Sequence, residues 1–230
     1  MKKVLLFIAA AVVLSGCGLL TQTTGGQFTR VSQYPMMYEE KPLTLLVMPP
    51  INNSSNVDAK ELLFTSISKP LVEAGYYVIS PRLAMDILKA ESAYDSELFY
   101  EGSLTPFKTV FGADAVVFSV IDTWAKKGFG IETKLSYIIR SAHTGEILFD
   151  RSCDLYLDLN QTSNSSSGLL GAVLDLATSA LSTALTDHIV AARKANYYIF
   201  KDIPRGKYNP DFGIDGDRAA EKKDISATVK

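Results

Sequence analysis

The chain has 230 residues, of which 47% are hydrophobic and 21% are charged, and its formal net charge is −2. This length is enough for one sizeable hydrophobic core or two small ones. A mildly acidic chain lacks the positive field that nucleic-acid-binding proteins present to phosphates, so we expect no nucleic-acid partner.

The first residues have the layout of a secretory signal peptide. Lys2 and Lys3 precede an uninterrupted apolar run over residues 4–14. A helix of this length would reach about 17 Å, which is short of the roughly 30 Å hydrocarbon core of a bilayer. The run is therefore too short to span a membrane, and its length is typical of the hydrophobic region of a signal peptide.

The residues after this run are Leu14-Ser15-Gly16-Cys17. They resemble the bacterial lipobox, which implies cleavage after Gly16, diacylglyceryl transfer to the Cys17 sulfur, and acylation of the new amino terminus, for instance with palmitate. Three acyl chains would hold the protein stably, because stable anchoring needs more than one chain. Gly18 stands where many inner-membrane lipoproteins of Gram-negative bacteria carry Asp, which favours the outer membrane with the domain facing the periplasm. The alternative is an ordinary cleavage site beside an unrelated cysteine.

Composition divides the chain into four parts. We expect a lipoprotein signal peptide over 1–16 and a lipid-anchored tether over 17–42, which is rich in Thr, Gln and Gly. A folded domain is expected over 43–200. The remaining extension, 201–230, is rich in Gly, Pro and charge, and we expect it to be largely disordered after residue 214.

The domain begins with an apolar run, LTLLVMPP at 43–50, which predicts a strand buried on both faces. Ser55 and Asp58 have capping-box spacing, which predicts the start of a helix. Pro70 should kink this helix or end its first part, because its ring displaces the backbone hydrogen bond to residue 66, and Gly75 should end the helix.

The next predicted elements, in chain order, are a strand at 76–80, a helix at 81–92, short helices over 96–111 and an apolar strand at 113–124.

The hydrophobic period then changes to two. Residues 131–140 and 147–157 each alternate apolar and polar side chains, which predicts two half-exposed antiparallel strands joined by the turn 143–146. Arg151 falls on the apolar face of the second strand, and a bulge or an edge position could resolve this conflict. Cys153 lies on the same face, where we expect a buried thiol that acts as a small hydrophobic side chain.

A polar connector precedes a long helix predicted over 169–195, which carries few charges before Asp187. Its apolar surface is wide enough to leave a strip for a partner or for a second copy of the chain. An equally open alternative is a helix packed on all sides. The candidate interface residues are Leu170, Val173, Leu174 and Leu181.

The order of strands and helices predicts a single α/β domain. Its mixed sheet should contain two parallel crossovers followed by an antiparallel meander, with helices packed on the sheet.

Few residues offer chemistry. His143 and His188 have no Ser, Cys or metal-ligand cluster beside them in sequence. Asp150, Asp154 and Asp158 share one outward strand face, but four residues of strand rise about 13 Å, more than the roughly 5–9.5 Å between paired glycosidase carboxylates. We therefore expect no catalytic residue, no metal site, no cofactor and no enzymatic activity.

One loop, 49–58, follows the carboxyl end of a strand and precedes a helix. Backbone N–H groups at such a position can hold an anion, although the loop has neither the Lys nor the glycine run of a Walker site. Its side chains Asn52, Asn53, Ser54 and Ser55 are therefore candidate ligand-binding or partner-binding residues. The favoured interpretation is that they satisfy turn and cap hydrogen bonds.

Several blocks of the sequence resemble one known family. They are residues 43–81, "FGADAVVFSVI" at 111–121, "HTGEILFD" at 143–150, "GLLGAVLDLATSAL" at 168–181 and "RGKYNPDFGID" at 205–215. In this order, over about residues 40–215, they resemble bacterial lipoproteins of unknown function similar to a meningococcal genome-derived lipoprotein antigen. The resemblance implies a fold similar to the TolB amino-terminal domain and the periplasmic domain of CsgG. It also implies a role beside CsgG-like proteins in envelope assembly or secretion, and it supplies no catalytic residues.

Two functional hypotheses follow. The first is a non-catalytic component of an envelope complex, held to the membrane by lipid and docked on periplasmic or outer-membrane proteins or on a second copy of itself. The second is a periplasmic binding module that takes a small envelope ligand at the loop 49–58.

Overall fold

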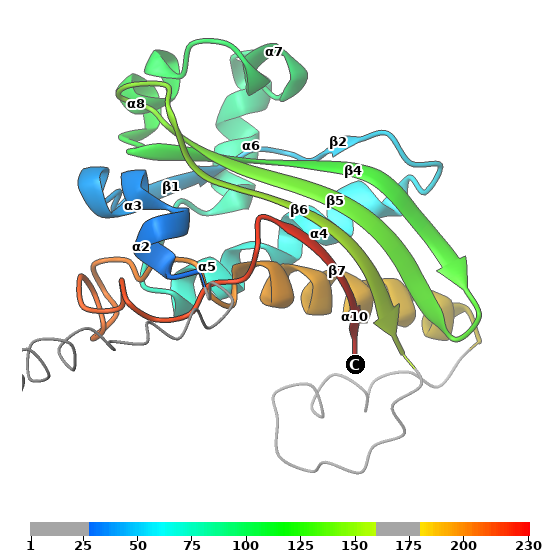
Figure 1. The fold of residues 1–230 in the computed structure, drawn as a ribbon. Coiled ribbons are helices and arrows are strands. Elements are labelled where there is room, and N and C mark those ends of the chain that lie inside the picture. Colours follow the sequence, from blue (N-terminus) through cyan, green and yellow to red (C-terminus); the bar gives the residue numbers. More distant parts are fainter. Residues whose placement is uncertain (1–27, 160–179) are drawn as a thin grey trace, which may run out of the picture.

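The structure is a computed structural model that describes residues 28–159 and 180–230, with side chains given outside 180–186. Its sheet has the strand order β3-β1-β4-β5-β6-β7, and β2 pairs with β4 (Figure 1). The strands are β1 (Thr44–Val47), β2 (Ile51–Asn52), β3 (Tyr77–Val78), β4 (Ala115–Lys127), β5 (Gly130–Ser141), β6 (Ile147–Asp158) and β7 (Asp224–Val229). The helices are α2 (Arg30–Gln33), α3 (Pro35–Glu40), α4 (Asp58–Ser66), α5 (Ser68–Glu73), α6 (Pro81–Ala90), α7 (Glu97–Tyr100), α8 (Thr105–Phe111) and α10 (Ala180–Phe200).

The predicted fold class is confirmed. Strand β1 pairs in parallel with both β3 and β4, so two crossovers carry the chain between these strands. Strands β4, β5 and β6 then form an antiparallel meander. Figure 1 shows α4 and α10 running along one face of the sheet, with α6, α7 and α8 gathered on the opposite side, near β1.

Strand β1 is buried on both faces, as its continuous apolar run predicts. Leu45 and Val47 belong to one hydrophobic cluster, which also holds residues of α4, α5 and α10. Leu46 and the following Met48 belong to a second cluster with residues of α6 and α8. The two clusters lie on opposite sides because neighbouring side chains of a strand point to opposite faces.

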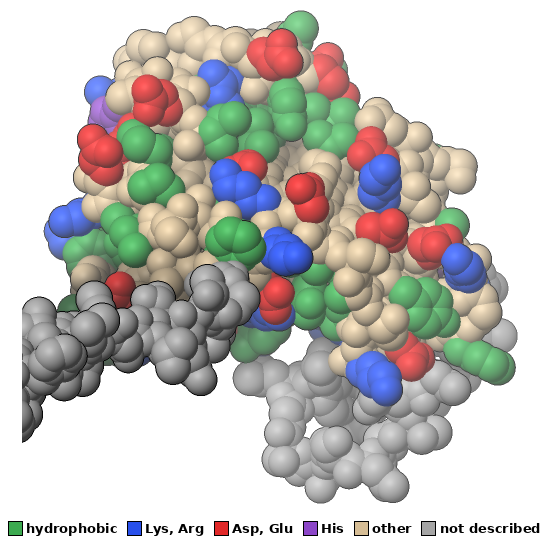
Figure 2. All heavy atoms as spheres, viewed as in Figure 1, with side chains coloured by type: hydrophobic (Ala, Val, Ile, Leu, Met, Phe, Trp, Pro, Cys, Tyr) green, Lys and Arg blue, Asp and Glu red, His purple; other side chains and the backbone are tan. Residues whose placement is uncertain are grey.

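The meander is buried on one face and open on the other. Leu135 and Ile139 of β5 are fully buried in the larger cluster, on the face that α10 covers. Lys134, directly before Leu135, is exposed, and so is Asp154 of β6 directly opposite it. Figure 2 shows charged side chains of both signs spread over the open face. The alternating pattern therefore places its strands correctly.

The break in the first long helix is also confirmed. Helix α4 ends at Ser66 and α5 begins at Ser68, with Pro70 inside α5. Proline has no N–H to donate to the carbonyl four residues earlier, so the helix is interrupted at that point.

The expected tether is shorter than predicted. Thr29 forms a capping box with Ser32 that starts α2, and Pro35 occupies the first turn of α3. Tyr34 and Met37 are buried in the larger cluster. Residues 29–40 are therefore part of the domain, because two short helices deliver apolar side chains into its core.

The expected disorder after residue 214 is wrong for the terminal strand. Residues 224–229 form β7, which pairs in parallel with β6. Ile225, Ala227 and Val229 pack on the larger cluster, so the strand gains both ladder hydrogen bonds and apolar burial.

No helix of the described residues combines the length and the hydropathy that crossing a membrane requires.

Candidate functional site

The candidate loop after β1 is held by its own side chains. The Asn52 Oδ1 atom accepts hydrogen bonds from the Ser54 backbone N–H at 3.1 Å and from the Ser54 hydroxyl at 2.7 Å. The Asn52 amide donates to the Asn56 carbonyl at 2.8 Å, and the Asn53 amide donates to Asp122 of β4 at 3.1 Å. These contacts account for Asn52, Asn53 and Ser54 as turn-forming residues, while Ser55 is exposed.

The capping box expected at Ser55 and Asp58 is wrong. Helix α4 has no capping hydrogen bond from its N-cap side chain, Val57. Instead, Asn56 Oδ1 accepts a hydrogen bond from the backbone N–H of Ala59 at 3.0 Å. The cap is therefore an Asn one position later than predicted, a residue type that caps as well as Ser.

A shallow pocket lies beside this loop, at the carboxyl end of β1. Its walls come from the loop, from the first turns of α4 and from α6. They are Pro49, Pro50, Val57, Asp58, Lys60, Glu61, Phe64 and Met85. Ser96, before α7, fixes one wall by donating to the Pro49 carbonyl at 2.6 Å. The predicted residues Asn52 to Ser55 are absent from this lining, so the pocket and the predicted polar side chains are different sites.

His143 contacts an aspartate, but the pair is open to solvent. Its Nε2 atom lies 3.2 Å from Asp114 Oδ1, with 41% and 35% of the two side chains exposed. The other oxygen of Asp114 accepts the backbone N–H groups of Leu43 and Thr44 at 3.0 and 2.9 Å. Burial alone would raise the pKa of Asp114, but these bonds and His143 lower it below the ordinary value. The carboxylate fastens the start of β1 to the 143–146 turn.

His188 is paired with the single tryptophan of the chain. The Trp124 indole N–H donates to His188 Nδ1 at 2.8 Å, and the two rings stack. An imidazole that accepts at Nδ1 carries its proton on Nε2 and is neutral. Burial lowers the pKa of His188, in agreement with that state. The pair joins α10 to the far half of β4.

Arg151 on β6 is buried, and both terminal nitrogens of its guanidinium are hydrogen-bonded, which resolves the conflict in the strand pattern. Its guanidinium donates to both oxygens of Asp202, at 2.6 and 3.0 Å, and to the Tyr34 hydroxyl at 2.7 Å. It also donates to the Ile199 carbonyl. Neither expected solution holds, because β7 covers the edge of β6 and the register around Arg151 is unbroken.

Cys153 is buried as predicted, with 2% of its surface exposed. Burial raises the pKa of its thiol to about 12. Because the thiolate is the nucleophilic form, this cysteine is chemically inert at neutral pH.

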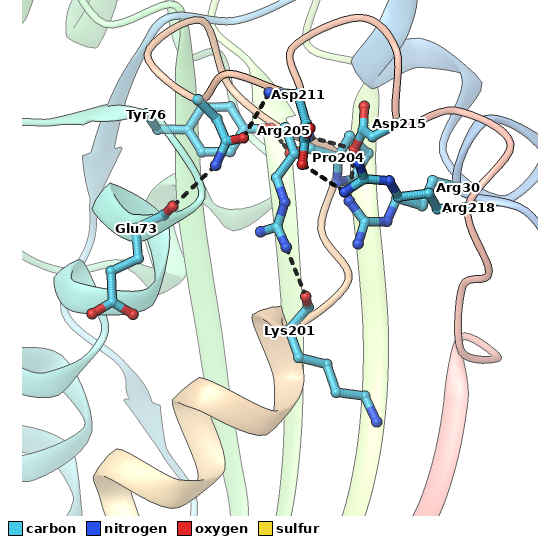
Figure 3. Close-up of polar contacts among 10 residues, drawn as sticks. Arg30, Glu73, Tyr76, Lys201, Pro204, Arg205, Asp211, Asp215 and Arg218 are labelled. Carbon is cyan, nitrogen blue, oxygen red and sulfur yellow. Dashed lines mark hydrogen bonds and ion pairs between the residues drawn. The ribbon is translucent and has the colours of Figure 1, made fainter. Parts of the chain in front are cut away.

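The segment after α10 forms a second polar cluster, drawn in Figure 3. Arg30 of α2 pairs with Asp215 at 2.7 Å, and both side chains are almost fully buried. The same Asp215 oxygen accepts the Arg205 backbone N–H at 2.9 Å. Arg218 pairs with Asp211 at 2.6 Å in a more exposed position. The cluster holds α2 against residues 205–218.

Glycines allow this segment to approach the α5–β3 turn. Gly75 has φ +98°, and a Cβ atom there would lie 2.5 Å from the backbone nitrogen of Asn209. The Gly206 N–H donates to the Ala74 carbonyl at 2.9 Å, and the Tyr208 N–H donates to Gly75 at 3.0 Å. The predicted helix end at Gly75 is thus also a docking point for the carboxyl-terminal segment.

Comparison with known proteins identifies the family. The family model "Putative lipoprotein GNA1162-like" matches residues 32–203. The chain belongs to the GNA1162-like family. It is 26% identical over 202 residues to the protein "Putative lipoprotein NMB1124/NMB1162" of Neisseria meningitidis serogroup B, an alignment that covers 86% of this chain and 89% of that one.

Two solved structures are also similar. The crystal structure of lipoprotein GNA1162 from Neisseria meningitidis has a TM-score of 0.46 and 24% identity, and it covers 63% of this chain and 98% of that one. The PelC dodecamer from Paraburkholderia phytofirmans has a TM-score of 0.33 and 12% identity, and it covers 66% of this chain and 89% of that one.

Membership of the GNA1162-like family agrees with the lipobox and implies a lipid-anchored protein of the cell envelope. Cys17 itself lies outside the described residues, as do three of the four candidate interface residues, Leu170, Val173 and Leu174. Leu181 falls within α10, where its side chain is not described.

Within 28–159 and 180–230, no three His, Cys, Asp or Glu side chains gather as a metal site would require. The polar clusters at Arg151 and Arg30 escape sequence analysis because their partners, Asp202 and Asp215, are 51 and 185 residues away. The sequence indicates the Arg151 cluster in one way: a basic residue falls on the apolar face of a strand.

Proposed function

We propose that the protein is an outer-membrane-anchored lipoprotein that faces the periplasm and acts as a non-catalytic component of an envelope assembly or secretion complex with CsgG-like partners. Membership of a lipoprotein family over residues 32–203 carries this proposal. The lipobox at Cys17 and the absence of Asp at position 18 support the choice of membrane.

The contacts of the polar side chains support a non-catalytic role. Asp114, Trp124 and Arg151 each join elements that are distant in sequence. These contacts give His143, His188 and Asp202 structural roles. We therefore expect the protein to act by docking on partners through its surface.

Fractionation of the native envelope, followed by crosslinking and mass spectrometry, tests the proposal. We expect the protein in the outer-membrane fraction, with crosslinks to envelope proteins. A Gly18→Asp variant should move to the inner membrane, and a Cys17→Ser variant should leave the membrane fraction. Recovery of the native protein solely as an unpartnered monomer would contradict the proposal.

A second candidate function is the binding of a small envelope ligand. The pocket at the carboxyl end of β1 supports it, because ligands of open α/β sheets bind at this end of the strands. Thermal-shift measurements with periplasmic small molecules would reveal such a ligand as a rise in Tm. Val57 lines the pocket and is 84% exposed, so Val57→Asp should abolish the rise without unfolding the protein.

A further inference from the structure

The fold fixes the point at which the chain leaves toward its lipid. Thr29 bridges to Ala219, and the described structure begins at Phe28. Cys17 lies 28 − 17 = 11 residues earlier, and eleven residues span at most about 40 Å in any conformation. The face that contains Phe28 therefore stays within about 40 Å of the acylated sulfur.

Large apolar side chains are exposed at this point. Phe28 is 44% exposed, Val31 is 40% exposed and Ile214 is 73% exposed. The Ala220 N–H donates to the Phe28 carbonyl at 2.7 Å, and the Val31 N–H donates to the Gly216 carbonyl at 3.0 Å. The backbone at Phe28 and Val31 thus lies beside residues 216–220, which follow Ile214 in the chain. We call these three side chains the exit patch.

The charges near the exit patch are balanced. Residues 201–222 contain five basic and five acidic side chains, so their formal net charge is zero. Lys201 pairs with Glu221 at 2.7 Å, and Arg218 pairs with Asp211 at 2.6 Å. Lys207 and Lys222 are also exposed. Lys side chains beside apolar ones are typical of surfaces that enter the headgroup region of a bilayer.

We propose that the exit patch rests on the membrane that holds the lipid anchor, with Ile214 and its two neighbours inserted among the headgroups. This inference rests on the lipid anchoring in the proposed function. The short connection keeps the patch at a high local concentration beside the bilayer, so even weak apolar contacts suffice to hold it there. The anchor and the patch together set the orientation of the domain, with the open face of β4–β6 free to meet proteins.

Fluorescence quenching in vesicles tests this orientation. The full-length lipidated protein is inserted into vesicles of phosphatidylethanolamine and phosphatidylglycerol. Ile214→Cys is labelled with an environment-sensitive dye, because the buried Cys153 and the acylated Cys17 do not compete for it. Phe129→Cys is the matched control, since Phe129 is 76% exposed at the β4–β5 turn, far from α2 in Figure 1. Nitroxide-labelled lipid should quench the dye at position 214 several-fold more than at position 129.

Two results would overturn the inference. One is equal quenching at both positions, which would mean that the domain has no preferred orientation. The other is a photocrosslinker at position 214 that captures a protein in the native envelope, because the patch would then be a protein interface. The mass of the amino-terminal peptide shows separately whether Cys17 is acylated. A protein that is acylated and crosslinked to partners, yet unquenched at 214, refutes the patch and leaves the proposed function standing.

Discussion

At the scale of the residue, Arg151 shows how β6 keeps a charge in its core. Its side chain has no exposed surface, and that of Asp202 is 8% exposed. Burial alone would raise the pKa of Asp202, but the hydrogen bonds and charge of Arg151 outweigh it and lower the pKa below the ordinary value. The pair is stable because each charge has a partner, and it becomes costly when one partner is removed.

Replacing Asp202 with Ala should therefore lower the free energy of unfolding by about 3–5 kcal/mol, as expected for a buried ion that loses its partner. Urea denaturation followed by circular dichroism measures this. Asp211→Ala, which breaks the exposed pair with Arg218, is the control and should change stability little. The double variant Arg151→Met/Asp202→Leu should be more stable than Asp202→Ala. If Asp202→Ala and the double variant lost the same free energy of unfolding, the loss would come from packing and not from the uncompensated charge.

The same pair predicts how stability depends on acid. The pKa of Asp202 is lower in the folded state than in the unfolded chain, where it is about 3.9. Its contribution is therefore fully present above about pH 4 and is lost as the pH falls through the folded value.

The Trp124–His188 pair predicts a second pH dependence of stability, and the fluorescence of Trp124 reports on it directly. The folded pKa of His188 is lowered by burial from an ordinary value of about 6.5. Its contribution to stability is therefore complete above about pH 6.5 and declines as the pH drops toward the folded value. Protonation of Nδ1 also places two N–H groups face to face.

We expect the emission of the single tryptophan to change as the pH falls below about 6.5, while the far-UV circular dichroism stays constant. Burial is the main cause of the lowered pKa of His188, and the charges of Asp187, Lys126 and Asp58 act on it as well. In His188→Gln the change should disappear. In His143→Gln, which alters a distant and exposed ring, it should persist. If the emission of both variants changed with pH in the same way, the change would come from a group other than His188.

At the scale of the element, the α5–β3 turn and the segment after α10 are locked together through Gly75. Both Gly75 and Gly112 have positive φ, at +98° and +64°, but only a Cβ on Gly75 meets neighbouring atoms. Gly112→Ala should cost about 1 kcal/mol because of its backbone conformation. Gly75→Ala should cost clearly more, since it also separates the turn from Asn209. Thermal unfolding measures both, and equal losses would show that the close approach contributes nothing.

The sequence predicts the central elements well for identifiable reasons. Strands β1 and β4 are predicted by continuous apolar runs, and β5 and β6 by the alternation of apolar and polar residues. The start of β6 departs from this pattern: Ile147 is exposed while Leu148 and Phe149 are both buried, because the register shifts there. Each pattern is a direct consequence of which faces are buried, so no tertiary information is needed.

The terminal elements were missed because their patterns are short. Ile225, Ala227 and Val229 do alternate with polar residues, but six residues without a visible partner strand do not distinguish an edge strand from a charged tail. The Thr29 capping box likewise opens a helix of only four residues. At the candidate loop, the turn-forming interpretation is confirmed for Asn52 and Ser54. The pocket beside the loop could not be predicted, because one of its walls is Met85 of α6 and no local sequence pattern tells where that helix packs.

At the scale of the whole molecule, the early start of the fold keeps the domain near its membrane. The expected tether of 17–42 would allow a much longer reach than the 11 residues from Cys17 to Phe28. Partners should therefore belong to the same membrane or lie close to it.

An insertion tests this restriction. Twenty Gly and Ser residues placed after residue 27 should leave the Tm unchanged, because the described contacts of the domain begin at Phe28. Crosslinking to partners in the same membrane should fall roughly fivefold, as the local concentration decreases with about the 3/2 power of linker length. Crosslinking that is unchanged would show that docking does not depend on tether length. A Cys17→Ser variant with the same insertion sets the background.

The bridge between Thr29 and Ala219 also has a mechanical consequence. A pull on the lipid enters the fold at Phe28, and the first bonds to carry it are the backbone hydrogen bonds to residues 216–220 and the buried Arg30–Asp215 pair. Strand β1, the centre of the parallel sheet, starts after α2 and α3. We therefore expect α2, α3 and the contacts that hold α2 to bear the tension between membrane and partner before it reaches the sheet.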